Sequence, residues 1–205
     1  MIGHVKVTRA DWLNLARDTL VHDGMAEVKI LGLAGQLNVS RSSFYWYFDS
    51  RKDLLNALLD DWEARNIGSI VDHCAMDAHK ITGALCHFFK CFVNPELFDP
   101  GLDFAVREWS RRDANVRARI DSADKTRLQA VRKMYERHGY CPDEADTRAR
   151  ILYFMQLGYH ALEQNETIET RMSRFEGFLH GFTGQEPTAQ ECADFKEYAH
   201  RVAPR

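Results

Sequence analysis

Residues 33–48 read LAGQLNVSRSSFYWYF and have the spacing of a helix-turn-helix. Two short helical patterns are separated by only a few residues, and Ala34 is small enough for two helices to cross closely at that point. Phe44 and Phe48 lie four residues apart, so they share one face of the second helix and anchor it. The side chains predicted to point inward are Leu33, Ala34, Leu37, Val39, Phe44 and Phe48.

The remaining side chains of the second helix must then point outward. They are Arg41, Ser42, Ser43, Tyr45, Trp46 and Tyr47. These side chains put an unusual amount of aromatic surface on one short helix, and soluble domains rarely expose such a patch without using it. The pattern therefore predicts a binding surface on this helix.

The charge around this helix indicates the partner. Between positions 29 and 52 the cations Lys29, Arg41, Arg51 and Lys52 accompany one anion, Asp49, which gives a local net charge of +3 in a chain of net charge −3. A positive surface beside exposed aromatic rings suits a phosphate backbone. We therefore expect double-stranded DNA to be the partner.

The whole chain has the composition of an all-α protein. It has 205 residues with only 12 Gly and 5 Pro, and apolar residues return every three or four positions nearly throughout. The periodicity indicates helices throughout. The length indicates one domain, or one domain with a small appendage. Thr8 with Asp11, and Ser50 with Asp53, have the spacing of helix N-caps. The expected helices cover about 8–24, 29–37, 40–48, 51–65, 71–93, a short stretch through Phe104 and Trp109, and then about 113–138, 144–164, 168–182 and 188–202.

Several classes of protein are disfavoured. No apolar run reaches the ~20 residues of a membrane span, and the opening residues 1–12 lack the apolar core of a secretory signal, so we expect a cytoplasmic protein with no membrane partner. The five cysteines contain no CxxC pair and are expected to be reduced thiols. The chain contains no GxGxxG, GxxxxGK[ST], HExxH or GxSxG motif, so we predict no enzyme activity and no cofactor.

His87 and Cys91 lie four residues apart, so both could bind a metal on one helix face. Zinc needs four converging ligands, which helical spacing alone does not provide. No metal site is predicted.

A set of short matches runs through about the first 55 residues: Thr8-Arg9, Gly24, Leu33-Ala34, Val39-Ser40, Phe44 to Phe48, Lys52 and Leu54-Leu55. On these residues the chain resembles the tetracycline-repressor (TetR) family of bacterial transcription regulators. The resemblance implies a three-helix DNA-binding domain over residues 1–50. Over residues 51–205 it implies a linking helix and a bundle that binds a ligand and dimerises. Leu37-Asn38 departs from the family's frequent Ala-Gly, although Asn tolerates the left-handed conformation better than most residues.

The resemblance also implies roles for individual residues. It places the second helix of the motif in the major groove, with Arg41, Ser42, Ser43 and Tyr45 nearest the base edges and Trp46 on the same DNA-binding surface. It assigns phosphate contacts to Tyr47 and Lys52 and places Lys29 against the DNA backbone. Base contacts would select the sequence, while phosphate contacts would set register and salt sensitivity.

Two apolar segments near the C-terminus suggest a homodimer. In the first segment, residues 151–162 are apolar on nearly all sides, so this helix must be covered all round, and Gly158 would allow close approach. The second segment is a continuous apolar stripe made of Ile168, Met172, Phe175, Phe178, Leu179 and Phe182. The family pairs its last two long helices across a dimer, and these segments are in the matching place. The predicted dimer residues are Ile151, Met155, Gly158, Leu162, Phe175, Phe178, Leu179 and Phe182. The alternative is that these side chains are buried within one monomer.

Family members sense a small molecule in a cavity among the middle helices, and most act as repressors on near-palindromic operators. Candidates for the cavity wall are Trp62, Phe88, Phe104, Trp109, Tyr153 and Gln156, because pockets are mostly apolar with a few polar groups. Each of these residues could instead be ordinary core.

Two other functions are kept as alternatives. One is a helical enzyme whose catalytic groups come from distant positions, and the other is a protein-interaction module that uses the aromatic helix. DNA binding weakens linearly with salt on logarithmic axes, whereas an aromatic protein contact should barely respond.

Overall fold

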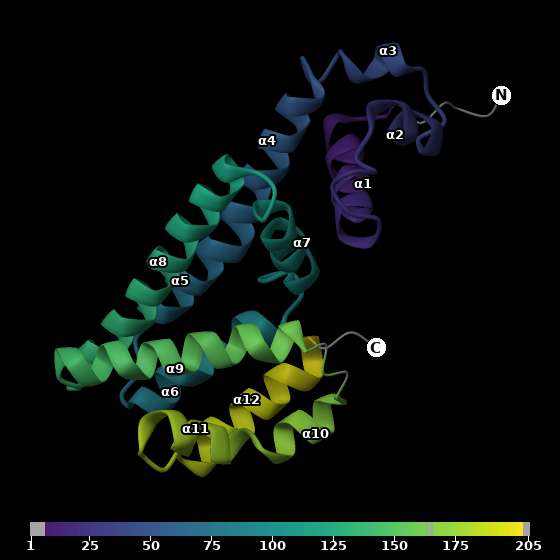
Figure 1. The fold of residues 1–205 in the computed structure, drawn as a ribbon. Helices are drawn as coiled ribbons and strands as arrows, with labels where there is room; N and C mark the ends of the chain where they lie inside the picture. Colours follow the sequence, from purple (N-terminus) through teal and green to yellow (C-terminus); the bar gives the residue numbers. More distant parts are fainter. Residues whose placement is uncertain (1–6, 163, 165, 203–205) are drawn as a thin grey trace. The chain divides into compact units, whose positions relative to one another are not determined.

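The structure, a computed structural model, describes residues 7–162, 164 and 166–202. Helices and no strands occur in this part of the chain, which confirms the all-α prediction (Figure 1). The helices are α1 (Arg9–His22), α2 (Ile30–Gln36), α3 (Arg41–Phe44), α4 (Arg51–Trp62), the π-helical turn η1 (Glu63–Ile67), α5 (Gly68–Ala75), α6 (Ile81–Val93), α7 (Pro100–Ser110), α8 (Ala114–Arg137), α9 (Pro142–Ala161), α10 (Ile168–Ser173), α11 (Phe175–Thr183) and α12 (Ala189–Val202).

Some expectations fall on residues that the structure does not describe. Residues 1–6, which belong to the expected N-terminal domain, and Glu163, which belongs to the expected helix 144–164, lie outside the described residues. Within the described part, no helix combines the length and apolar character that crossing a bilayer would require.

The chain divides into two compact units. The first contains the chain up to Ala64 together with Gly101–Ile120, and the second contains Arg65–Pro100 and the chain from Asp121 onward. Helix α8 therefore contributes residues to both units. The functional boundary expected at residue 50 remains a prediction.

The first unit contains the predicted helix-turn-helix. Helix α1 packs against α4 and α2, and α2 packs against α3. Trp12 of α1 is fully buried and meets the Phe44 ring edge-on, with 5.2 Å between the ring centroids. Phe48 stacks on Phe44 with 5.4 Å between the ring centroids, so the two phenylalanines anchor the motif as predicted.

The N-caps predicted at Thr8 and Ser50 are present, whereas Ser40 precedes α3 without a side-chain capping bond. Thr8 Oγ1 accepts a hydrogen bond from the Asp11 backbone N–H, and Asp11 Oδ2 accepts one from the Thr8 N–H, which completes a capping box. Ser50 Oγ likewise accepts from the Asp53 N–H at 3.2 Å. These bonds satisfy backbone donors that have no partner within the helix, and so fix where α1 and α4 begin.

In the second unit, α6 packs against α5, α11 and α12, and α9 packs against α11 (Figure 1). Helix α6 is almost entirely buried, as expected for a central helix. Phe175 of α11 stacks on Phe195 of α12 with 3.9 Å between ring centroids. Phe175 also packs edge-on against Phe89 of α6 at 5.9 Å, so aromatic contacts in this core join helices that are near and far in sequence.

Four expected helices differ from those observed. The expected helix 71–93 is two helices separated by residues 76–80, and the expected helix 168–182 is interrupted at Arg174. Helix α4 ends at Trp62 and continues as η1. Helix α3 ends at Phe44, after which Tyr45, Trp46 and Tyr47 donate backbone hydrogen bonds to the third residue before them, so the last turn is tightened.

Candidate nucleic-acid interface

The turn of the helix-turn-helix depends on Asn38. Its φ is +54°, and it is the one described non-glycine residue in the left-handed region. Its N–H donates to the Gly35 carbonyl at 3.1 Å, and the Val39 N–H donates to the Ala34 carbonyl at 3.0 Å. The left-handed residue reverses the chain after α2 and lets α3 begin at Arg41. Asn38 thus fills the place where the resemblance expects glycine.

The predicted outward face of α3 is solvent-exposed. Trp46 is 75% exposed and Tyr45 is 45% exposed, while Phe44 beneath them is fully buried. Arg41 and Ser42 are also exposed, and Ser43 and Tyr47 are half-buried. An aromatic cluster that only packed helices together would not leave Tyr45 and Trp46 this exposed.

Arg41 and Tyr45 are in direct contact. Arg41 Nη2 donates to the Tyr45 hydroxyl oxygen at 2.9 Å, and the guanidinium carbon lies 5.8 Å from the centre of the tyrosine ring. The Tyr45 ring also packs edge-on against Phe44 at 5.3 Å. This chain of contacts ties the exposed guanidinium to the buried core.

The serines at the start of α3 bond to one another. The hydroxyls of Ser40 and Ser42 lie 2.8 Å apart, and the Ser43 hydroxyl donates to the Ser40 carbonyl at 2.8 Å. Ser43 therefore uses its one hydroxyl hydrogen inside the protein and presents only acceptor lone pairs.

The local cations have different surroundings. Lys52 is exposed at the start of α4, as a phosphate contact would require. Lys29 is exposed too, but its ammonium lies 3.1 Å from the Glu27 carboxylate. Arg51 is held by backbone carbonyls of the segment before α2 and is a structural residue. The count of +3 therefore overstates the charge available to DNA.

Tyr47 has a partner inside its own unit. Its hydroxyl donates to the Val7 carbonyl at 2.7 Å, just before α1. This bond occupies the hydroxyl hydrogen that the expected phosphate contact would use. Tyr47 therefore connects α1 to the helix-turn-helix in this structure.

One exposed residue on this unit was missed. Leu31 of α2 is 73% exposed, with Gly32 beside it also exposed. Leu31 falls outside the spacing that buries Leu33 and Ala34, and this was the sequence signal that could have identified it.

The predicted effector residues are divided between the two units. Trp62, Phe104 and Trp109 belong to the first, and Phe88, Tyr153 and Gln156 belong to the second. All are buried except Phe104, which is half-buried.

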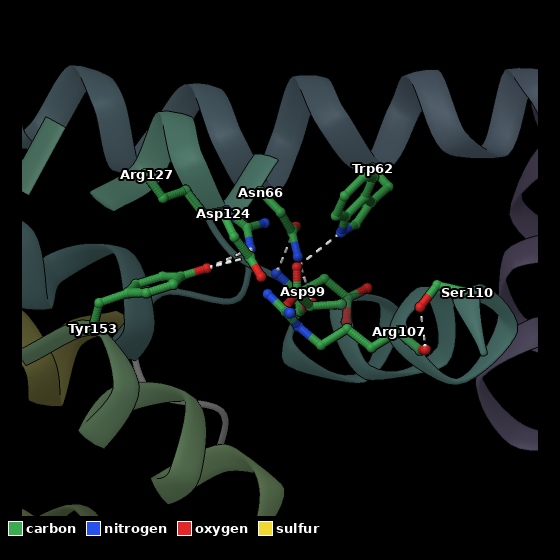
Figure 2. A network of polar contacts seen from close by, with 9 residues as sticks. Trp62, Asn66, Asp99, Arg107, Ser110, Asp124, Arg127 and Tyr153 are labelled. Carbon is green, nitrogen blue, oxygen red and sulfur yellow. Dashed lines mark hydrogen bonds and ion pairs between the residues drawn. The ribbon is translucent and has the colours of Figure 1, made fainter. Parts of the chain in front are cut away.

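Polar partners occupy the polar ends of two of these side chains (Figure 2). Trp62 Nε1 donates to Asp103 at 2.8 Å, and Arg107 Nε donates to the same carboxylate at 2.9 Å. In the second unit the Tyr153 hydroxyl donates to Asp124 at 2.7 Å and accepts from Arg127 at 3.2 Å. Gln156 is the one predicted effector residue that lines a described pocket, with neighbours that include Phe89, Met155 and Phe178.

The predicted dimer residues separate into two groups. Ile151, Leu162 and Phe178 are exposed, and Met155 and Gly158 are half-buried. Phe175, Leu179 and Phe182 are instead buried in the core of their own unit, where Phe175 stacks on Phe195. For these three residues the expected contact with a partner is corrected, because this core already covers them. Phe154, which lies within the apolar segment 151–162, is also exposed.

His87 and Cys91 are not part of a metal site in the described residues, where no group of three or more His, Cys, Asp or Glu side chains could hold an ion. Cys91 is buried and donates to the Ser69 carbonyl at 3.3 Å. Burial raises the pKa of its thiol, as it raises the pKa of Cys74 to about 12. Both thiols therefore stay protonated and poorly suited to metal binding.

Solved structures share this fold. A TetR-family transcriptional regulator from Marinobacter aquaeolei VT8 aligns with a TM-score of 0.65 at 11% identity, over 97% of this chain and 100% of that chain. GusR from Salmonella enterica aligns with a TM-score of 0.57 at 13% identity, over 98% and 97% of the two chains. A TetR-like transcriptional regulator from Rhodococcus sp. RHA1 aligns with a TM-score of 0.54 at 15% identity, over 97% of each chain. At these identities the likeness shows the fold alone.

Sequence comparison locates the family signal in the first unit. Residues 13–58 match the family described as bacterial regulatory proteins, tetR family. No curated protein matches the chain. The matched segment contains the turn at Asn38 and the exposed face of α3 described above. Residues 13–58 therefore match the tetR family of bacterial regulatory proteins, and the chain shares its fold with regulators of that family.

Proposed function

We propose that the protein is a repressor that binds a near-palindromic operator as a homodimer and releases it when a small molecule binds. The observation that supports this most is the exposed surface of Arg41, Tyr45 and Trp46 on a helix that Phe44 and Phe48 fix from below. A rigid, cationic and aromatic helix face suits the major groove. Lys52, at the start of the next helix, supplies a phosphate contact.

The homodimer forms through α9 and α11. Ile151, Phe154 and Leu162 are exposed on α9 and directly after it, and Phe178 is exposed on α11. Exposed apolar side chains at this density mark an interaction surface. A second copy covers this surface and sets the two α3 helices about 34–36 Å apart, as successive major grooves require.

The effector binds in the second unit, in the pocket lined by residues such as Phe89, Met155, Gln156, Phe175 and Phe178. The pocket is mostly apolar with a few polar groups, as small-molecule sites usually are. Met155 and Phe178 were predicted as dimer residues, so an occupant of this pocket lies close to the proposed dimer surface. Coupling of about 1–3 kcal/mol between effector and DNA is enough to change operator occupancy several-fold.

A gel-shift experiment with the DNA flanking the protein's own gene tests this function. The protein should retard a specific fragment, and candidate effectors should release it. Tyr45→Ala and Lys52→Ala should both weaken binding, and Tyr45→Ala should weaken it more for the specific fragment than for random DNA. If both variants bind as tightly as the parent at ~150 mM salt, DNA is not recognised by this surface. Binding that does not respond to salt would favour a protein partner for the aromatic helix.

A further inference from the structure

The exposed face of α3 presents hydrogen-bond donors in a fixed arrangement. Arg41 and Tyr45 are one helical turn apart, with Arg41 Nη2 bonded to the Tyr45 hydroxyl at 2.9 Å. The tyrosine ring is held edge-on against buried Phe44, with an interplanar angle of 89°. Because one side chain positions the other, less side-chain entropy is lost when the pair meets a ligand.

The bond between the two side chains decides what they offer to DNA. A guanidinium has five N–H donors and no acceptor, and one of its nitrogens is committed to Tyr45. The tyrosine oxygen accepts that bond and keeps its own hydrogen to donate. The remaining guanidinium N–H groups and the tyrosine O–H are therefore donors on exposed side chains. The Ser43 hydroxyl hydrogen beside them is already used on the Ser40 carbonyl.

Each base pair shows a different pattern in the major groove. Guanine shows two neighbouring acceptors, O6 and N7, whereas adenine shows an acceptor beside an amino donor. Asn and Gln are the side chains that usually recognise adenine, and residues 41–47 contain neither. The free donors of the Arg41–Tyr45 pair are complementary to the two neighbouring acceptors of guanine.

We infer that Arg41 and Tyr45 act together to select guanine in each half of the bound DNA site, with Arg41 making the base contact and Tyr45 positioning it. This inference rests on the proposed function, because it assumes that α3 enters the major groove. A phosphate is also an acceptor, so the test must separate a base contact from a backbone contact.

Selection of bound duplexes from a random pool at ~150 mM salt makes this separation, and it works even when the operator sequence is unknown. The parent protein should enrich sequences with a fixed guanine in each half-site. It should prefer guanine over other bases there by about 5- to 150-fold, the range of one bidentate contact. Arg41→Ala should lose the preference at those positions and keep the preferences elsewhere.

Two further variants test the role of each side chain. Tyr45→Phe keeps the ring and removes the hydroxyl, so it should lower the preference for guanine several-fold. Lys52→Ala is the matched control, because loss of a phosphate contact weakens all sequences alike and leaves the preferences unchanged.

Each other outcome counts against the inference. If Arg41→Ala weakens every sequence equally, Arg41 contacts phosphate and the inference is wrong. Enriched sites without a fixed guanine overturn it and leave the proposed function standing. A parent protein that enriches no sequence overturns both.

Discussion

Arg51 Nε donates a hydrogen bond of 2.6 Å to the carbonyl oxygen of Val28, a fully buried residue just before α2. Nη2 of the same side chain donates to the Met25 carbonyl at 2.9 Å. The first residue of α4 thereby holds the segment that leads into the helix-turn-helix. Arg51 stabilises the DNA-binding unit from within.

Arg51→Ala should destabilise the protein. The substitution leaves two carbonyl groups without their charged donor, and hydrogen bonds to charged groups contribute about 1.5–3 kcal/mol each before solvent access is considered. Because Arg51 is half-buried, we expect a loss of about 2 kcal/mol in the free energy of unfolding, measured by urea denaturation.

Lys52→Ala is the matched control on the neighbouring residue. Lys52 is exposed, so its removal should change stability by less than ~0.5 kcal/mol. It should instead weaken DNA binding and lower the slope of log affinity against log salt by about 1. Equal effects of the two substitutions on stability would contradict the separate roles of Arg51 and Lys52.

Arg51 and Lys52 show which features of the site could be predicted from the sequence and which could not. The family motif located α3, the helix proposed to bind DNA, and its buried and exposed faces followed from the spacing of Phe44 and Phe48. Charge counting treated Arg51 and Lys52 as equivalent cations, because the carbonyl groups that bind Arg51 come from residues more than twenty positions away. Contacts of this kind depend on the fold and are not visible in local composition.

Asn38→Gly and Asn38→Ala should differ in stability. Asn38 has a φ of +54°, a conformation that costs an ordinary L-residue about 1–2 kcal/mol and costs glycine nothing sterically. We expect Asn38→Ala to lose about 1 kcal/mol, and Asn38→Gly to stay within ~0.5 kcal/mol of the parent. Thermal unfolding of the three proteins measures this. If alanine were tolerated as well as glycine, the left-handed turn would not be a constraint.

Asp103→Ala should destabilise the first unit strongly. Asp103 is fully buried and accepts hydrogen bonds from Trp62 and Arg107. Removing one partner of a buried ion pair leaves the other charge poorly solvated, so we expect a loss of about 3 kcal/mol in the free energy of unfolding. Glu108→Ala is the control, because Glu108 is exposed on the same helix and should change stability by less than ~0.5 kcal/mol. A similar loss from both substitutions would mean that the buried carboxylate has no special role.

Phe154→Arg should convert the proposed dimer to a monomer. Phe154 is 52% exposed on α9, and a charge placed within the proposed apolar interface must be desolvated without a partner. Light scattering coupled to size-exclusion chromatography measures the mass, and the parent should elute at twice the monomer mass. Leu31→Arg is the control, because Leu31 is an exposed apolar residue of the first unit and should leave the mass unchanged. A parent protein that is already monomeric would rule out the proposed dimer.

Sequence periodicity did not predict which partner covers the proposed dimer residues or where the long helices break. The pattern of Phe175, Leu179 and Phe182 showed that they face apolar surroundings, but burial in the same chain and burial against a partner give the same pattern. Residues 76–80 break the expected helix 71–93 without glycine or proline. The break lets α5 pack against α6, so tertiary packing decides its place.

His87→Gln should remove part of the pH dependence of stability. Burial lowers the pKa of His87 from its usual value of 6.5, and the positive charge of Lys90 lowers it further. Nδ1 of His87 is buried without a hydrogen-bond partner in the described structure, so the neutral ring is the favoured form in the folded state. As the pH falls through 6.5, His87 takes up a proton more readily in the unfolded chain than in the folded one. The free energy of unfolding that this difference contributes is therefore fully present above pH 6.5 and is lost as the pH falls. Urea midpoints of parent and variant between about pH 7.5 and 5 should therefore converge or cross as the parent loses stability faster. Parallel curves would show that His87 titrates alike in both states.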